Sequence, residues 1–184
     1  TFVLINPNAK GGRVGRIWPE LEAALRTRGV EFERRFTSEP GDGEALVRAA
    51  ARGGARRFLV AGGDGTLNEA VNGLFEIPSN GVSPRAPIVA DSLVGILPMG
   101  SGGDFARTLG LPRSPKKALD RILASAGAPC DVGRLRFVGH DGVPKERLFI
   151  NIASFGIGGE VDRLVNRSKK PLGGTIAFAV ASLK

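Results

Sequence analysis

Apolar and polar positions along most of the chain follow two periods. Continuous apolar runs at residues 2–5, 57–61 and 93–97 are typical of strands buried on both faces of a parallel sheet. Between them, apolar residues recur at helical spacing, as in residues 17–25. Strands that alternate with helices predict an α/β fold, in which a parallel sheet carries helices on both faces.

The same pattern locates the expected elements and loops. Strands are expected at residues 2–5, 31–37, 57–61 and 93–97. Helices are expected in a segment that Gly29 closes and at residues 44–52, 67–75 and 118–126. Segments rich in glycine, proline or small polar residues predict loops at residues 6–12, 62–66, 79–91 and 100–104.

The hydrophobic pattern changes after Gly127. Residues 131–137 and 147–153 are predicted to be strands joined by a hairpin, with no helix between them. We therefore expect a boundary near Ala128, between an α/β domain (1–128) and the start of a β-rich, β-sandwich domain (129–184). The chain stops at Lys184 inside an apolar periodic segment, so we expect the second domain to be incomplete and the parent protein to continue.

Composition and charge narrow the class of protein. The 184 residues are 42% hydrophobic and 24% charged, which is typical of a globular protein. A net charge of +8 favours anionic partners, such as phosphates or acidic lipid surfaces, although the scattered basic residues fit solvated faces equally well. No aromatic residues are interleaved with short basic pairs such as Lys116-Lys117 and Lys169-Lys170, so nucleic acid is not an expected partner.

The cysteine content and the hydropathy indicate the expected cellular location of the protein. One cysteine and one histidine exclude an intrachain disulfide and a Cys/His zinc cluster, which fits a reducing compartment. No apolar stretch reaches the roughly 18 residues needed to cross a bilayer, and no signal peptide is visible. We expect a cytoplasmic protein.

Three glycine-rich loops carry the candidate chemistry. Residues 6–12, 62–66 and 100–104 each follow an expected strand, and parallel strands end at the same edge of a sheet. Glycine lets backbone N–H groups approach an anion, and the helix that follows adds partial positive charge. Three converging loops of this kind predict a polyphosphate site, which makes 1–128 a nucleotide-binding domain.

The second loop adds a hydroxyl and a carboxylate. Thr66 is expected at the N-cap of the next helix, where it can donate to a phosphate oxygen. Asp64 would repel phosphate unless a cation such as Mg²⁺ bridged them. For any one loop, a helix-entry turn with Asp and Thr as caps remains an alternative. Neither a P-loop nor a G-x-G-x-x-G dinucleotide motif is present.

At residues 62–74, Gly-Gly-Asp-Gly-Thr-Leu-Asn-Glu-Ala-Val-Asn-Gly-Leu, the sequence resembles the diacylglycerol kinase catalytic domain family. The Gly-Gly-Asp-Gly-Thr core is shared with NAD kinases and phosphofructokinases, whereas the extension through Asn72-Gly73 is more particular to lipid kinases. The resemblance extends to Asn6-Pro7, Thr37 and the segments 97–107, 131–133 and 149–156.

The resemblance implies an ATP-dependent kinase that transfers the γ-phosphate to a lipid hydroxyl, with Mg²⁺ as cofactor. Asp64, Asp104 and Asp131 would hold the metal, in part through water, and Asp64 would also support catalysis. Expected partners are ATP, a lipid substrate and a membrane surface bound peripherally, with a homodimer left open. The residues implied to contact ATP are Asn6, Thr37, Gly63, Asp64, Gly65, Thr66, Asn68 and Ser101.

Two departures from the family pattern qualify this picture. Gly103 stands where the family usually has Asn before the aspartate of the third loop. The family's general base lies beyond Lys184, so this chain alone is expected to lack a complete catalytic apparatus.

Other interpretations remain open. Asp104 could be only a helix N-cap, and Asp131 only a surface residue at a strand end. For the whole chain, the alternatives are an NAD kinase or a sphingoid-base kinase of the same superfamily, and a nucleotide-binding module without catalysis.

Overall fold

The computed structural model describes residues 1–76, 86–101, 103–139 and 141–153, and Thr1–Ile150 form one compact unit. Most of the loop expected at 79–91, and the second domain after residue 153, lie outside the described residues. Crossing a lipid bilayer would require a longer and more apolar helix than any found in these ranges.

A parallel sheet forms the centre of this unit. Its strand order is β2-β1-β3-β4, and all three neighbouring pairs are parallel. The strands are β1 (Phe2–Ile5), β2 (Glu33–Phe36), β3 (Arg57–Gly62) and β4 (Leu93–Pro98). Each strand overlaps one predicted from the sequence, so the α/β parallel-sheet fold is confirmed.

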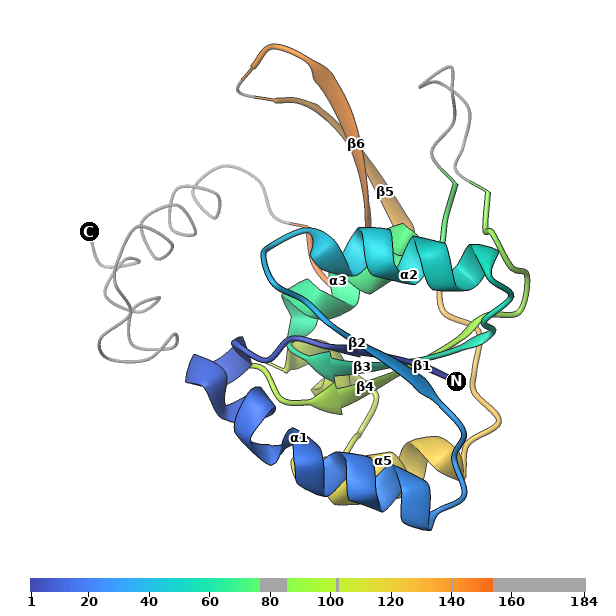
Figure 1. Cartoon of the computed structure of the whole chain (residues 1–184). Helices are drawn as coiled ribbons and strands as arrows, with labels where there is room; N and C mark the ends of the chain where they lie inside the picture. Colours follow the sequence, from blue (N-terminus) through green and yellow to red (C-terminus); the bar gives the residue numbers. More distant parts are fainter. Residues whose placement is uncertain (77–85, 102, 140, 154–184) are drawn as a thin grey trace. The chain divides into compact units, whose positions relative to one another are not determined.

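Helices cover both faces of the sheet, as predicted (Figure 1). Helices α1 and α5 pack on one face, and α2 and α3 pack on the other. The helices are α1 (Ala9–Thr27), α2 (Asp42–Arg52), α3 (Asp64–Gly73), α4 (Asp104–Thr108) and α5 (Pro115–Leu123). Lys10, Gly11 and Gly12 have left-handed backbone conformations, so the regular part of α1 begins only after this predicted loop.

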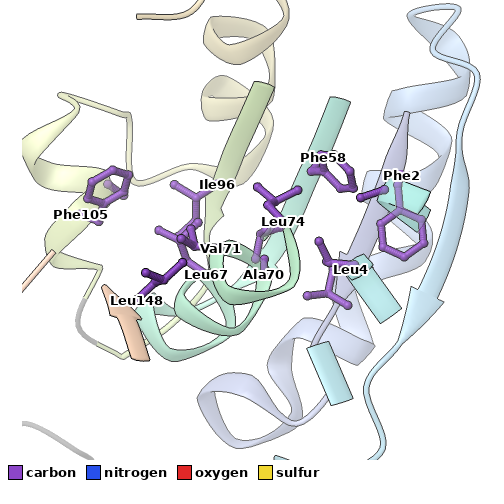
Figure 2. Packing of buried hydrophobic residues seen from close by; sticks show 14 residues of the cluster. Phe2, Leu4, Phe58, Leu67, Ala70, Val71, Leu74, Ile96, Phe105 and Leu148 are labelled. Carbon is purple, nitrogen blue, oxygen red and sulfur yellow. The ribbon is translucent and has the colours of Figure 1, made fainter. Parts of the chain in front are cut away.

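The core is divided by the sheet. In β1, Phe2 and Leu4 point into the layer under α2 and α3, whereas Val3 and Ile5 point into the layer under α1. All four are at most 3% exposed, which explains the continuous apolar run. Figure 2 shows the first layer, in which Leu148 lies beside Leu67 and Val71 of α3, whereas Phe2 and Leu4 of β1 lie at the other side of the layer.

Strand β2 differs from its neighbours. It lies at the outer side of the sheet, and all four of its residues are exposed. Trp18 of α1 packs edge-on against Phe36, with ring centroids 6.2 Å apart. The other residues of the strand are charged, and Arg34 pairs with Glu22 of α1 at 3.0 Å. Among the strands of the described ranges, β2 therefore pairs along one edge only, with β1, and its surface is mostly polar.

After α5 the chain forms a separate antiparallel hairpin of β5 (Gly133–Val138) and β6 (Pro144–Phe149). The second strand was predicted at residues 147–153, so its position was wrong. Backbone pairing of Gly133 with Phe149 and of Val138 with Pro144 fixes the register, and this places the strand earlier in the chain. Because the first residues of β6 are mostly polar, the hydrophobic pattern did not reveal the start of this strand.

Candidate functional site

The strand order places the switch point of the sheet between β1 and β3. The chain goes outward from β1 to β2 and then returns to β3 on the other side of β1. Open parallel sheets bind ligands at the carboxyl ends of the strands, where the order reverses. Asn6 directly follows β1 and Gly63 directly follows β3, so both predicted residues lie at this point.

Asn6 and Thr66 connect the two loops at the switch point. The Asn6 side-chain amide Nδ2 donates to Thr66 Oγ1 at 3.1 Å, and Asn6 Oδ1 accepts from the Asn8 backbone at 3.1 Å. Thr66 is 6% exposed. Because a threonine hydroxyl both donates and accepts, this contact leaves the Thr66 proton available to a further acceptor.

Thr66 is not an N-cap, which corrects the sequence prediction. Helix α3 begins at Asp64 and its N-cap is Gly63, so Thr66 is the third residue of the helix. The Gly-Asp-Gly sequence indicated a turn, yet Asp64 and Gly65 already have helical conformation. The hydroxyl therefore faces Asn6 from the first helical turn instead of closing the end of the helix.

The second and third loops touch through glycine backbone. A Cβ on Gly100 would lie 2.4 Å from the Cα of Gly63, and a Cβ on Gly63 would lie 3.1 Å from the Cα of Gly100. Any side chain on Gly100 would force the two loops apart. Gly65 is different, because it is exposed and a Cβ there would meet no atom within 4 Å. The first turn of α3 is thus packed on one side and open on the other.

Asp64 connects the same two loops by a hydrogen bond. Its Oδ2 accepts from the backbone N–H of Asp104 at 3.0 Å. Its Oδ1 is buried and has no hydrogen-bond partner among the described residues. Buried oxygens are normally paired, so this atom fits contact with a group from outside the chain, such as a cation or its water. The Asp104 carboxylate pairs with Arg107 in the same short helix.

The structure joins Asp64 with Asp104 but forms no three-carboxylate cluster. In the described ranges, no group of three or more His, Cys, Asp or Glu side chains is placed to hold a metal ion. Asp131 is exposed ahead of β5, which fits the alternative of a surface residue at a strand end. Gly103, and not Asp104, is the N-cap of α4. A Mg²⁺ site that includes Asp131 through water stays a prediction.

The other residues implied to contact ATP have mixed surroundings. Thr37 follows β2, is 7% exposed, and donates its backbone N–H to the Ile5 carbonyl at 2.9 Å. Asn68 is half-buried on α3, and Ser101 is exposed in the third loop. Their contact with a nucleotide stays a prediction.

Glu69 has a role that the sequence did not reveal. Its two carboxylate oxygens accept from the backbone N–H groups of Gly41 and Gly43, each at 3.0 Å. These are groups at the start of α2, so Glu69 supplies the cap that this helix lacks locally. The partners lie more than 25 residues away in the sequence, at separations of 28 and 26, so no local pattern could have revealed the contact.

A second polar group joins α2 to the end of α3. Arg48 donates to Glu44 at 2.9 Å and to the backbone carbonyl of Asn72 at 2.9 Å. Burial raises the pKa of Glu44, but hydrogen bonds and charge from Arg48 and Arg147 outweigh this, and the pKa is lowered overall. A Cβ on Gly73 would lie 2.5 Å from the Glu44 carbonyl oxygen, so the two helices pack closely there.

Comparisons with known proteins identify the family of the chain. A family model described as "Diacylglycerol kinase catalytic domain" matches residues 1–135. The chain is 36% identical over 168 residues to a Chromohalobacter salexigens protein named "Probable lipid kinase YegS-like", covering 90% of this chain and 48% of that protein. It is 30% identical over 182 residues to a Staphylococcus carnosus protein named "Diacylglycerol kinase", covering 99% and 53%. The chain thus spans about half the length of the curated relatives it matches.

Solved structures show the same fold. A diacylglycerol kinase from Bacillus anthracis str. Sterne is 27% identical, with a TM-score of 0.54, covering 73% of this chain and 46% of that one. A second structure from the same organism has a TM-score of 0.56 over 89% of this chain and 55% of that one, and its 24% identity supports the fold alone. Since the family model matches most of its length, the chain belongs to the diacylglycerol kinase catalytic domain family.

Proposed function

We propose that this chain is the ATP-binding part of a lipid kinase that transfers the γ-phosphate to a hydroxyl of diacylglycerol or a related lipid. The observation that carries the proposal is the Asn6–Thr66 hydrogen bond at the switch point, beside the open space at Gly65. The relatives' names, a probable lipid kinase and a diacylglycerol kinase, support a lipid acceptor.

The first turn of α3 is the proposed phosphate site. Backbone N–H groups at a helix start have no partner within the helix, and the absent side chain of Gly65 leaves them accessible. Thr66 can donate its hydroxyl proton to a phosphate oxygen while its oxygen accepts from Asn6. The chain's contribution is therefore positioning and hydrogen bonding of the phosphates.

Asp64, Asp104 and Asp131 are the residues proposed to hold Mg²⁺, in part through water. The unpartnered Oδ1 of Asp64 is the feature that fits such an ion. When bound, Mg²⁺ would neutralise the negative charge of the phosphates. Without a cation, the Asp64 carboxylate would repel them.

The acceptor half of the reaction is proposed to lie elsewhere in the parent protein. We place the domain boundary near Ala128, with the general base and the lipid site mostly beyond Lys184. A lipid acceptor requires the parent protein to approach a membrane surface peripherally, and the net charge of +8 favours an anionic one.

Calorimetric titration of the chain with ATP, with and without Mg²⁺, tests the nucleotide site. We expect Mg²⁺-dependent binding that Asp64→Asn weakens by about tenfold or more, because it removes the charge of a buried oxygen. The matched control is Asp120→Asn, a change on the exposed outer side of α5 that should leave binding unchanged. Equal binding by both variants would contradict the proposed metal role of Asp64.

Phosphate transfer from labelled ATP by the full-length parent tests the acceptor class. Diacylglycerol and sphingosine in mixed micelles, and NAD in solution, are the substrates to compare. Transfer to diacylglycerol is expected, whereas transfer to sphingosine alone would indicate a sphingoid-base kinase. Transfer to NAD would indicate an NAD kinase, and ATP binding without any transfer would indicate a non-catalytic nucleotide-binding module.

A further inference from the structure

Asn72 lies at the end of α3 opposite the proposed phosphate site and is 0% exposed. Its side-chain amide bonds the backbone of Leu148 in both directions. Nδ2 donates to the Leu148 carbonyl at 2.9 Å, and Oδ1 accepts from the Leu148 N–H at 3.0 Å. These two hydrogen bonds resemble those that the backbone of a neighbouring β-strand would make. The Asn72 side chain thus fixes the position of β6 along α3.

The hairpin has no other strand as a neighbour in the described part of the chain. β5 and β6 form a sheet of their own, separate from the four parallel strands. Besides Asn72, β6 is attached through the Leu148 side chain, which packs in the core beside Leu67 and Val71 (Figure 2). Val132, directly before β5, and Ile150, directly after β6, also pack against this core. Arg147 adds an ion pair with Glu44 of α2. A two-stranded hairpin is marginal alone, so these contacts determine where it lies.

Helix α3 connects the residues that attach β6 to the phosphate turn, which is the first turn of α3, where phosphate is proposed to bind. It has ten residues, Asp64–Gly73, and begins with the turn that Asn6 and Asp104 contact. Asn72 Nδ2 also donates to the Asn68 carbonyl at 2.8 Å, one helical turn nearer to the site. A helix this short spans only about 15 Å and is stiff, so a shift of β6 relative to α3 is a shift relative to the phosphate turn.

We propose that Asn72 is a positioning residue, which holds the β5–β6 hairpin at a fixed place relative to the first turn of α3, the proposed phosphate site. The inference rests on the proposed kinase function, because the segment after β6 leads into the part of the parent expected to bind the acceptor. Phosphoryl transfer depends on alignment of donor and acceptor, and a displacement of about 1 Å can cost about 100-fold in rate.

The test uses the full-length parent with Asn72→Ala and Asn72→Asp. The matched control is Leu25→Ala, which removes a fully buried side chain from the core layer on the other face of the sheet, to which no residue of β6 belongs. Three quantities are compared: kcat for the lipid, Kd for ATP, and the hydrogen-exchange rate of the Leu148 amide. The melting temperature of each variant shows whether Leu25→Ala is a fair match for loss of stability.

Both Asn72 variants should lose about tenfold or more in kcat while Kd for ATP stays within about twofold. The Leu148 amide should exchange faster, whereas amides of β1 and β3 should not. Leu25→Ala should keep kcat even though it loses stability. A neutral aspartic acid has one donor and one acceptor for Leu148, so the Asn72→Asp variant should recover part of its kcat as pH is lowered, relative to the unsubstituted enzyme.

Unchanged exchange at Leu148 would overturn the attachment itself. Faster exchange with a kcat no lower than that of Leu25→Ala would overturn the positioning role. If the unsubstituted parent phosphorylates no lipid, the proposed function fails on its own account, and the exchange result still decides whether Asn72 holds the hairpin.

Discussion

The two ends of helix α3 carry glycine in opposite surroundings. A Cβ on Gly65, in the first turn, would meet no atom within 4 Å, whereas a Cβ on Gly73, in the last, would lie 2.5 Å from the carbonyl oxygen of Glu44. Gly65 leaves room beside the proposed phosphate site, and Gly73 lets α2 pack against α3. One motif therefore has an open end, where a ligand is proposed to bind, and a closely packed end.

Gly73→Ala should have the largest effect on stability. The added methyl would overlap the Glu44 carbonyl oxygen and lie 2.9 Å from Val47 Cβ, so α2 and α3 would have to separate. We expect a loss of about 3 kcal/mol in the free energy of unfolding, the upper part of the usual range for overpacked sites. Urea denaturation measures it, and a loss below about 1 kcal/mol would show that the helices move apart easily.

Glu69→Ala should have the next largest effect on stability. It removes the acceptors for the N–H groups of Gly41 and Gly43 at the start of α2. Loss of a helix cap costs about 1–2 kcal/mol. Urea denaturation should show this loss and amide exchange should be fastest at Gly43, while Glu69→Gln, which keeps one oxygen acceptor, should lose less.

The Glu44 carboxylate should produce a smaller and pH-dependent effect. Burial raises the pKa of Glu44, but hydrogen bonds and charge from Arg48 and Arg147 lower it by more than burial raises it. The folded-state pKa therefore lies below the ordinary value of 4.5. The stabilisation is therefore present above about pH 4.5 and is lost as the pH falls below it. Glu44→Gln should cost about 1 kcal/mol at pH 7, and its unfolding free energy should converge with that of the unsubstituted chain toward pH 3. A constant difference across this range would contradict the ion-pair origin.

Gly65→Ala should have the smallest effect on stability. The position is helical and open, so we expect a change within about 1 kcal/mol, in the stabilising direction. Binding of ATP should nevertheless weaken by about tenfold, because the methyl occupies the space by which phosphate reaches the backbone. Calorimetric titration of Gly65→Ala and Gly73→Ala with ATP compares how the two ends of the helix affect ATP binding. Unchanged ATP affinity in Gly65→Ala would remove the main support for the proposed site.

Local patterns in the sequence predicted most of the sheet and the meeting of the glycine-rich loops at one edge. Buried strands such as β1 and β3 are apolar throughout, and the edge at which parallel strands end follows from their connection by helices. The start of α3 was missed because Gly63, Asp64 and Gly65 favour a turn as strongly as a helix entry.

Contacts between distant segments could not be predicted in this way. Asn72 meets Leu148 across 76 residues, and Glu69 meets Gly41 across 28. Neither residue differs locally from a polar side chain on a solvated helix face. The predicted grouping of Asp131 with Asp64 and Asp104 rested on resemblance alone, and the described residues join only the last two.

The charged outer strand β2 has a consequence for self-association. An unpaired strand edge offers its N–H and C=O groups to any other extended chain, including a second copy of itself. Glu33, Arg34 and Arg35 occupy three of the four positions of β2, and all are exposed. A copy that paired edge to edge would bring arginines close together and would have to give up part of their hydration. The strand that completes the sheet thereby also protects it against aggregation.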